Sequence, residues 1–113
     1  MLDTDRRDKP LTLSQQADKM NKRIKEQFKN IPRYRYWIVC NYFSPNHGYN
    51  FFFEVRRPRM YGRSYPLVRL EDCSLERLIR FLLIIRQSWG FTIEYRNFNR
   101  YELFAIRDAI NEH

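Results

Sequence analysis

The segment from residue 33 to residue 57 constrains the fold more than any other part of the chain. Residues 33–43, RYRYWIVCNYF, are rich in aromatic and β-branched types that favour strands. Residues 49–57, YNFFFEVRR, alternate between an inward set (Tyr49, Phe51, Phe53, Val55) and an outward set (Asn50, Phe52, Glu54, Arg56). Between them, PNHG at 45–48 is typical of a turn, in which Pro45, Asn46 and Gly48 supply the special backbone angles. The sequence therefore predicts a β-hairpin, although neither face of 33–43 is plainly polar and either could be the buried one.

A helix is expected before this hairpin and a third strand after it. Thr12 and Gln15 form a capping-box pattern, and apolar residues then recur at helical spacing until Pro32 ends the predicted helix (Leu13, Ala17, Met20, Ile24, Phe28). The strand near 65–70 should be short or lie at an edge of the sheet, because Pro66 cannot donate a hydrogen bond to a neighbouring strand.

Two more helices and a fourth strand are expected in the second half. Asp72 or Ser74 caps a helix that runs to Trp89 and ends at Gly90, with one apolar side (Leu75, Leu78, Ile79, Leu82, Ile85, Trp89). Arg86 projects among these residues, where it either extends to solvent or pairs with Glu54 or Glu94. Residues 91–96 alternate as a strand, and Asn99 with Glu102 caps a final helix with Leu103, Ile106 and Ile110 on one side.

The resulting order, α-β-β-β-α-β-α, predicts an α+β fold: a single small domain with a mostly antiparallel sheet and helices packed on one face. We expect this domain at 12–113, after a flexible polar tail at 1–11. The longest aliphatic run, LLII at 82–85, is far below the ~20 residues of a membrane span. The charged N-terminus lacks the apolar stretch of a signal peptide, and Cys40 and Cys73 form no C-x-x-C pair. These features favour a cytoplasmic protein with reduced thiols.

The positive charge of the chain is concentrated in its middle third. Residues 31–70 carry seven arginines against one glutamate, a net charge of +6, whereas residues 1–30 carry +3 (eight basic, five acidic) and residues 71–113 carry −1 (six basic, seven acidic); together these give the formal net charge of +8. All five lysines precede residue 30, so every later cation is an arginine, which binds phosphate and carboxylate in bidentate fashion. Such a local excess is typical of a surface that contacts phosphate.

Catalytic motifs are missing from the sequence. His47 lies in the predicted turn and His113 is the last residue, and Cys40, His47 and Cys73 lack the spacing of zinc ligands. The chain contains no P-loop, no G-x-G-x-x-G and no H-E-x-x-H. We therefore expect no enzyme, no metal and no cofactor, with a toxin-type endoribonuclease that works through arginine, lysine and tyrosine as a minor alternative.

The preferred hypothesis is a basic nucleic-acid-binding protein. Arginines would neutralise phosphates of DNA or RNA and tyrosines could stack on unpaired bases; the candidate residues are Arg33, Tyr34, Arg35, Tyr36, Arg56, Arg57, Arg59, Tyr61, Arg63 and Tyr65. The alternative is an interaction module, of the kind that phages and mobile elements encode as inhibitors, that binds an acidic surface of a host protein. An exposed Phe52 would favour a protein partner, and a continuous arginine stripe from the sheet to the N-terminal lysine face would favour nucleic acid. A homodimer through the aromatic face of the sheet also stays open.

Overall fold

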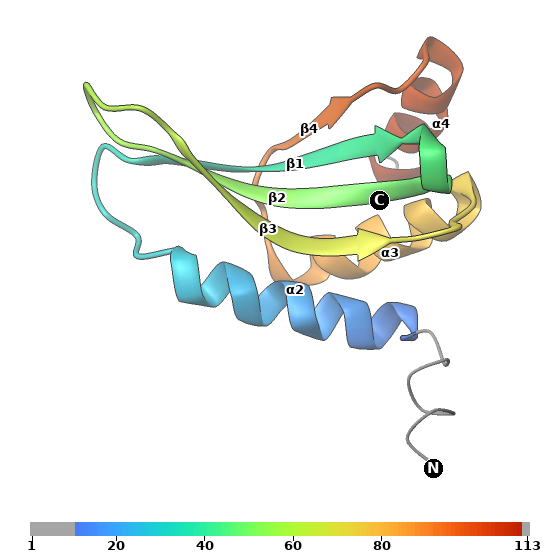
Figure 1. The fold of residues 1–113 in the computed structure, drawn as a ribbon, viewed down its shortest axis with the longest axis horizontal. Coiled ribbons are helices and arrows are strands. Elements are labelled where there is room, and N and C mark those ends of the chain that lie inside the picture. The colour runs from blue at the N-terminus through green and yellow to red at the C-terminus, as the bar shows by residue number, and fades with distance from the viewer. Residues whose placement is uncertain (1–10, 112–113) are drawn as a thin grey trace.

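The computed structural model describes residues 11–111 and confirms the α+β fold and the order of its elements (Figure 1). The elements are α2 (Leu13–Gln27), β1 (Arg35–Phe43), the short 3-10 helix η1 (Ser44–Asn46), β2 (Gly48–Arg56), β3 (Arg63–Leu70), α3 (Leu75–Ser88), β4 (Ile93–Arg96) and α4 (Arg100–Asn111). The strands form one sheet in the order β3-β2-β1-β4, in which β4 runs parallel to β1 and the other neighbours are antiparallel. Of the predicted tail, residues 1–10 lie outside the described part of the chain.

The hairpin of β1 and β2 forms the centre of the sheet. Its register pairs Arg35 with Arg56 at one end and Phe43 with Gly48 at the other. The turn differs from the prediction: His47 takes the left-handed conformation (φ 47°), and Gly48 has no positive φ. Gly48 is needed instead because a Cβ there would lie 2.5 Å from the carbonyl oxygen of Leu70. The glycine thus allows β2 to approach the end of β3, while the histidine makes the turn.

The two faces of the sheet differ, and this decides which face of β1 is buried. Tyr49, Phe51, Phe53 and Val55 of β2 lie in the core beneath α2 and α3, as predicted, together with Ile38 and Cys40 of β1. The opposite face, which we call the open face, carries the alternate residues of the strands (Arg35, Trp37, Val39, Asn41, Asn50, Phe52, Glu54, Arg56). Val39 is fully buried on this face, yet it is not part of the core cluster.

Helix α2 begins as the sequence predicts but ends earlier. The side chain of Thr12 accepts a hydrogen bond from the Gln15 amide, and the Gln15 side chain accepts one from the Thr12 amide. The helix ends at Gln27, five residues before Pro32, because Phe28 leaves the helical conformation. The Phe28 ring then packs edge-on against Tyr36 and Phe91, at 4.7 and 5.1 Å between ring centroids. Packing of one aromatic side chain, rather than proline, therefore sets this boundary.

Helix α3 packs against both the sheet and α2. Ser74, one of the two predicted caps, accepts a hydrogen bond from the Arg77 amide. Phe81, absent from the predicted apolar side, is fully buried against Phe51. Arg86 is exposed near the end of α3, which is the first of its two predicted alternatives, and it donates a hydrogen bond to the Phe91 carbonyl at 2.8 Å. It does not pair with Glu54 or Glu94, because both carboxylates lie on the open face.

The two outer strands limit further pairing of the sheet. β3 is an edge strand, as Pro66 predicted, and it starts two residues earlier than expected. A bulge leaves Leu67 without a partner on β2, and the guanidinium of Arg23 donates a hydrogen bond to the Leu67 carbonyl. β4 has only four residues, and the Asn99–Glu102 capping box starts α4 directly after it, as predicted. Prolines, bulges and short strands are devices that prevent edge-to-edge association.

A substitution of Gly48 tests the close approach of the turn to β3. In Gly48→Ala, the new Cβ meets a backbone oxygen that cannot move freely, so we expect the free energy of unfolding to fall by about 1–3 kcal/mol. The matched control is Gly90→Ala, where no described atom lies within 4 Å of the added Cβ; it should be neutral or stabilising by up to about 1 kcal/mol. Urea titration followed by circular dichroism measures both, and equal effects of the two substitutions would contradict the close approach.

Candidate nucleic-acid interface

Six arginines gather at one end of the molecule, where the connection at 28–34 meets the connection at 57–62 (Figure 1). Strand pairing brings them together: Arg35 is the register partner of Arg56, and Arg63 is the partner of Val55, next to Arg56. The other three lie in the adjoining connections. We call this cluster the basic end; it consists of Arg33, Arg35, Arg56, Arg57, Arg59 and Arg63.

Among the described residues, the arginines of the basic end have no carboxylate partner, whereas other arginines of the sheet do. On the rest of the sheet, Arg69 lies 3.7 Å from Glu71 and bonds Asn50, and Arg96 donates a 2.8 Å hydrogen bond to Glu94. Among residues 11–111, no ion pair and no side-chain hydrogen bond involves an arginine of the basic end. Their guanidinium groups are therefore available to an external anion, which distinguishes this cluster from the paired arginines elsewhere on the sheet.

Two of these arginines are positioned by aromatic rings. Arg35 lies over the ring of Trp37, at 5.8 Å from its centroid, and the half-buried Arg57 lies over the ring of Tyr34 at 5.9 Å. A cation above a ring face is attracted by the ring quadrupole, by roughly 0.5–1 kcal/mol at exposed sites. The planar guanidinium keeps its N–H groups free at its edge in this arrangement. The two stacked arginines are thus partly ordered before any ligand binds.

Two others occupy a backbone conformation that arginine rarely adopts. Arg33 and Arg59 both have positive φ, 71° and 60°. For a residue with a side chain this conformation costs roughly 1–2 kcal/mol, and glycine is the usual choice. Arginine at both positions, one in each connection, is a strained choice that a binding role for the side chains would explain.

Shallow hollows lie on either side of Arg56. One, of about 450 Å³, is lined by Arg35, Tyr36, Trp37, Arg56, Thr92 and Glu94 on the open face of the sheet. The other, of about 470 Å³, is lined by Arg56, Arg57, Arg59, Met60 and Tyr61. Because Arg56 lines both, one elongated ligand could occupy the two hollows together.

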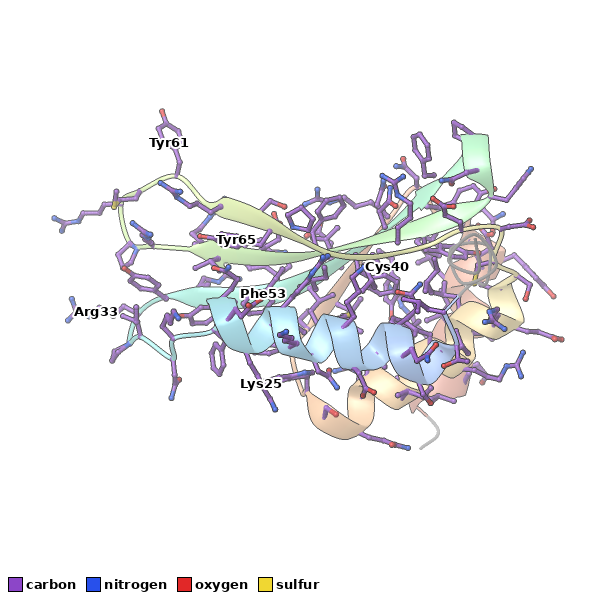
Figure 2. All side chains as sticks on the ribbon, turned by 60° about the horizontal axis from the view of Figure 1, so that its bottom comes forward. Lys25, Arg33, Cys40, Phe53, Tyr61 and Tyr65 are labelled. Atoms are coloured by element: carbon purple, nitrogen blue, oxygen red, sulfur yellow. The ribbon has the colours of Figure 1, made fainter. Side chains whose placement is uncertain are left out.

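The predicted tyrosines divide into two groups. Tyr61 is 96% exposed at the tip of the 57–62 connection, where its ring points away from the protein (Figure 2). Tyr36 and Tyr65 lie on the helix-facing side, and both pack against the core. Tyr36 also stacks on Phe53 at 5.8 Å and accepts a hydrogen bond from the Ile31 amide. Tyr61 is therefore the tyrosine most available to a ligand, and Tyr34 supports Arg57.

Trp37 and Met60 are two candidate residues that sequence reasoning missed. The Trp37 indole donates a hydrogen bond to Glu94 at 3.1 Å, and the Arg96 and Trp37 hydrogen bonds hold the pKa of Glu94 below its usual value. Glu54, the register partner of Trp37, has a buried carboxylate oxygen with no hydrogen-bond partner in the described structure. The sequence did hold a signal for Trp37: it follows Arg35 by two residues on a predicted strand, so both side chains lie on the same face. Met60, 60% exposed beside Tyr61, has no such signal.

An exposed Phe52 was expected for a protein partner and a continuous arginine stripe for nucleic acid, and neither feature is fully present. Phe52 is half-buried on the open face. A continuous arginine stripe across the sheet is not formed, because Arg69 and Arg96 are paired with carboxylates. The basic charge is instead concentrated at one end, near which Lys25, in the last turn of α2 (Figure 2), is also exposed, as is Lys29 just after the helix.

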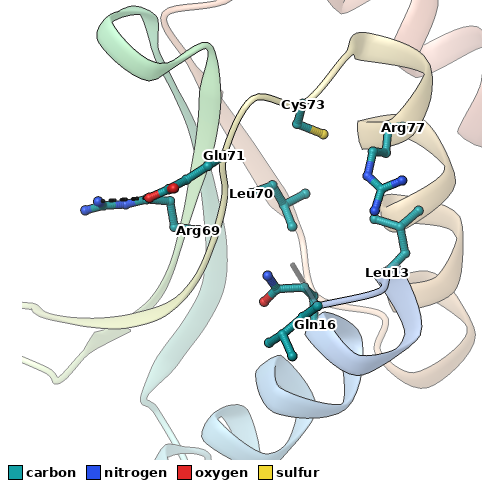
Figure 3. Close-up of a pocket in the computed structure, with 8 residues that line it drawn as sticks. Leu13, Gln16, Arg69, Leu70, Glu71, Cys73 and Arg77 are labelled. Atoms are coloured by element: carbon teal, nitrogen blue, oxygen red, sulfur yellow. Dashed lines mark ion pairs between the residues drawn. The ribbon is translucent and has the colours of Figure 1, made fainter. Parts of the chain in front are cut away.

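Metal ligation and thiol chemistry are the other properties that the sequence raised for these side chains. Within residues 11–111, no group of three or more histidine, cysteine, aspartate or glutamate side chains is close enough to hold a metal ion. Cys40 and Cys73 are buried free thiols, and burial raises the pKa of both, which keeps them protonated and unreactive. A separate hollow of about 230 Å³ between α2, β3 and α3 is bordered by Cys73, Arg77 and the Arg69–Glu71 ion pair (Figure 3).

Comparison with known proteins does not suggest a function for this chain, so a function has to be inferred from the structure. No protein-family model, curated protein or solved structure matches this chain. In the described part of the chain, no helix combines the length and the apolar character that crossing a membrane requires.

Replacing Arg59 by glycine separates stability from binding. Glycine removes the left-handed strain of roughly 1–2 kcal/mol but gains roughly 0.5–1 kcal/mol of unfolded-state entropy, so the free energy of unfolding should stay equal or rise by up to about 1.5 kcal/mol. Affinity for single-stranded nucleic acid should fall in the same variant. Thermal unfolding and fluorescence anisotropy measure the two quantities. A stability loss would show that the Arg59 side chain is structural instead.

Proposed function

We propose that this protein binds single-stranded nucleic acid through its basic end. The observation that carries the proposal is the set of six arginines at the basic end, three placed by strand pairing and three by the adjoining connections, that have no carboxylate partner among the described residues. Bringing like charges together costs free energy, which a bound polyanion offsets. Phosphates repeated along a strand match several separate cations better than one compact anion does.

The preference for a single strand rests on two aromatic residues. Tyr61, exposed at the tip, and Trp37, half-buried on the open face beneath Arg35, line the two hollows that share Arg56. An unpaired base can stack on such a ring, an interaction worth roughly 1–3 kcal/mol, whereas bases within a duplex are already stacked. The proposal therefore combines phosphate contacts by arginine with base contacts at the two rings.

A triple substitution tests the phosphate contacts. In Arg57→Ala/Arg59→Ala/Arg63→Ala, removal of three phosphate contacts should reduce the slope of log K against log salt by about 2 and weaken binding at low salt. The matched control, Lys22→Ala/Arg77→Ala/Arg80→Ala, removes the same charge from exposed positions on α2 and α3. Fluorescence anisotropy with labelled single-stranded RNA, single-stranded DNA and duplex DNA measures both. Equal losses in the two variants would mean that net charge, and not the basic end, determines binding.

A substitution of Tyr61 tests the preference for single strands. Tyr61→Ala should weaken binding of single-stranded probes by about tenfold, because one stacking contact is lost, and should leave duplex binding unchanged. Tyr61→Phe keeps the ring and should bind as the parent protein does. If Tyr61→Ala binds every probe as the parent does, stacking at the tip is excluded. Binding of a host protein, with none of any nucleic acid, would favour the acidic-partner alternative.

A further inference from the structure

Arg35 and Arg56 place two like charges directly opposite each other on the open face of the sheet. They are register partners at the outer end of the β1–β2 hairpin, so their Cβ atoms lie roughly 4.5–5.5 Å apart. We call them the arginine pair. Like charges in this position destabilise a sheet, and among the described residues neither side chain has a carboxylate partner or a side-chain hydrogen bond. An anion bound between them would remove this repulsion.

A carboxylate on the same face does not pair with the arginine pair. Glu54 precedes Arg56 by two residues on β2, so both side chains lie on the open face. One carboxylate oxygen of Glu54 is buried and has no hydrogen-bond partner in the described structure. Within residues 11–111, no ion pair joins Glu54 to either arginine. Because this acceptor is not used, both guanidinium groups stay available to a ligand.

The run of unpaired cations ends at the arginine pair. On one side, Arg57 and Arg59 line the neighbouring hollow. On the other side, the hollow of about 450 Å³ is bordered by Glu94, which the Trp37 indole and the Arg96 guanidinium hold at 3.1 and 2.8 Å. A strand that continued past the pair would therefore meet a fixed carboxylate and an arginine that is already bonded to it. Phosphate contacts are favourable up to the pair and not beyond it.

A phosphate at the end of a strand suits the arginine pair better than a phosphate inside the strand. A phosphodiester carries one negative charge, whereas a phosphate monoester carries about −1.5 to −2 at pH 7 and has three strong acceptor oxygens. Two opposed guanidinium groups can each donate two parallel hydrogen bonds to such a group. The ring of Trp37 beneath Arg35 already orders one of them. The charge and the number of donors both match a terminal phosphate.

We propose that the arginine pair binds the terminal phosphate of a single strand. The rest of the strand then extends past Arg56 into the hollow that Arg57, Arg59 and Tyr61 line. The inference rests on the proposed binding of single strands and makes the substrate class narrower: a strand with a phosphorylated end that the protein grips at that end.

Strands of one sequence that differ only at their ends test the terminal site. Internally labelled probes carry a 5′-phosphate, a 3′-phosphate or hydroxyl groups at both ends, and a fourth probe is circular. In fluorescence anisotropy, one of the two phosphorylated strands should bind at least about tenfold more tightly than the hydroxyl-ended strand, because charge-assisted hydrogen bonds are gained. The circular strand should bind as the hydroxyl-ended strand does. Equal affinity for all four would overturn the terminal site but keep strand binding, whereas no binding of any probe would overturn both.

Replacing Arg35 tests whether the arginine pair is the cause of the preference. Arg35 is exposed and, of the two hollows, lines only the one bordered by Glu94. Arg35→Ala should bring the affinity ratio of phosphorylated to hydroxyl-ended strand to within about twofold of one, because the second guanidinium is lost. The matched control is Arg59→Ala, which removes the same charge from the other hollow; it should weaken all strands alike and keep the parental ratio. The same fall of the ratio in both variants would overturn the assignment to the pair.

Competition separates the end of a strand from a free nucleotide. Adenosine 5′-monophosphate and adenosine 3′-monophosphate offer the same phosphate group without the contacts at the second hollow. Each should displace the phosphorylated strand only at concentrations roughly a hundredfold or more above the dissociation constant of that strand, because linked contacts strengthen binding. Displacement at a concentration near that constant would identify a free nucleotide as the ligand and overturn the proposal.

Discussion

The antiparallel pairing of β1 with β2 is the constraint on which the rest of the structure depends. Its register sends Ile38, Cys40, Phe51 and Phe53 toward α2 and α3, where they form the centre of the core. Because side chains alternate, a slip of one residue would turn every one of them to the opposite face. Gly48 permits this register, because only a residue without a Cβ lets β2 begin so close to the carbonyl oxygen of Leu70.

The same pairing determines where the positive charges of the described structure gather. It brings the start of β1 and the end of β2 to one point, so that Arg35 lies beside Arg56 and the arginines of both flanking connections join them. Such a cluster opposes folding through repulsion, and the structure moderates it with aromatic rings under Arg35 and Arg57 rather than with carboxylates. The proposed binding of nucleic acid gives this arrangement a physical reason, because each phosphate would neutralise a charge that has no carboxylate partner among the described residues.

The sequence by itself determined the elements, their order, the inward set of β2, the capping boxes at Thr12 and Asn99 and the edge position of β3. These follow from local rules: side-chain alternation, helical spacing and the missing amide of proline. The tertiary structure decided what depends on contacts between distant segments. Phe28 ends α2 early because its ring packs on Tyr36, Phe81 is buried because β2 presents Phe51 to it, and Arg86 bonds Phe91 rather than a carboxylate. It also separated Tyr61 from Tyr36 and Tyr65, since identical residue types on a strand and a loop tip differ only in what the fold packs against them.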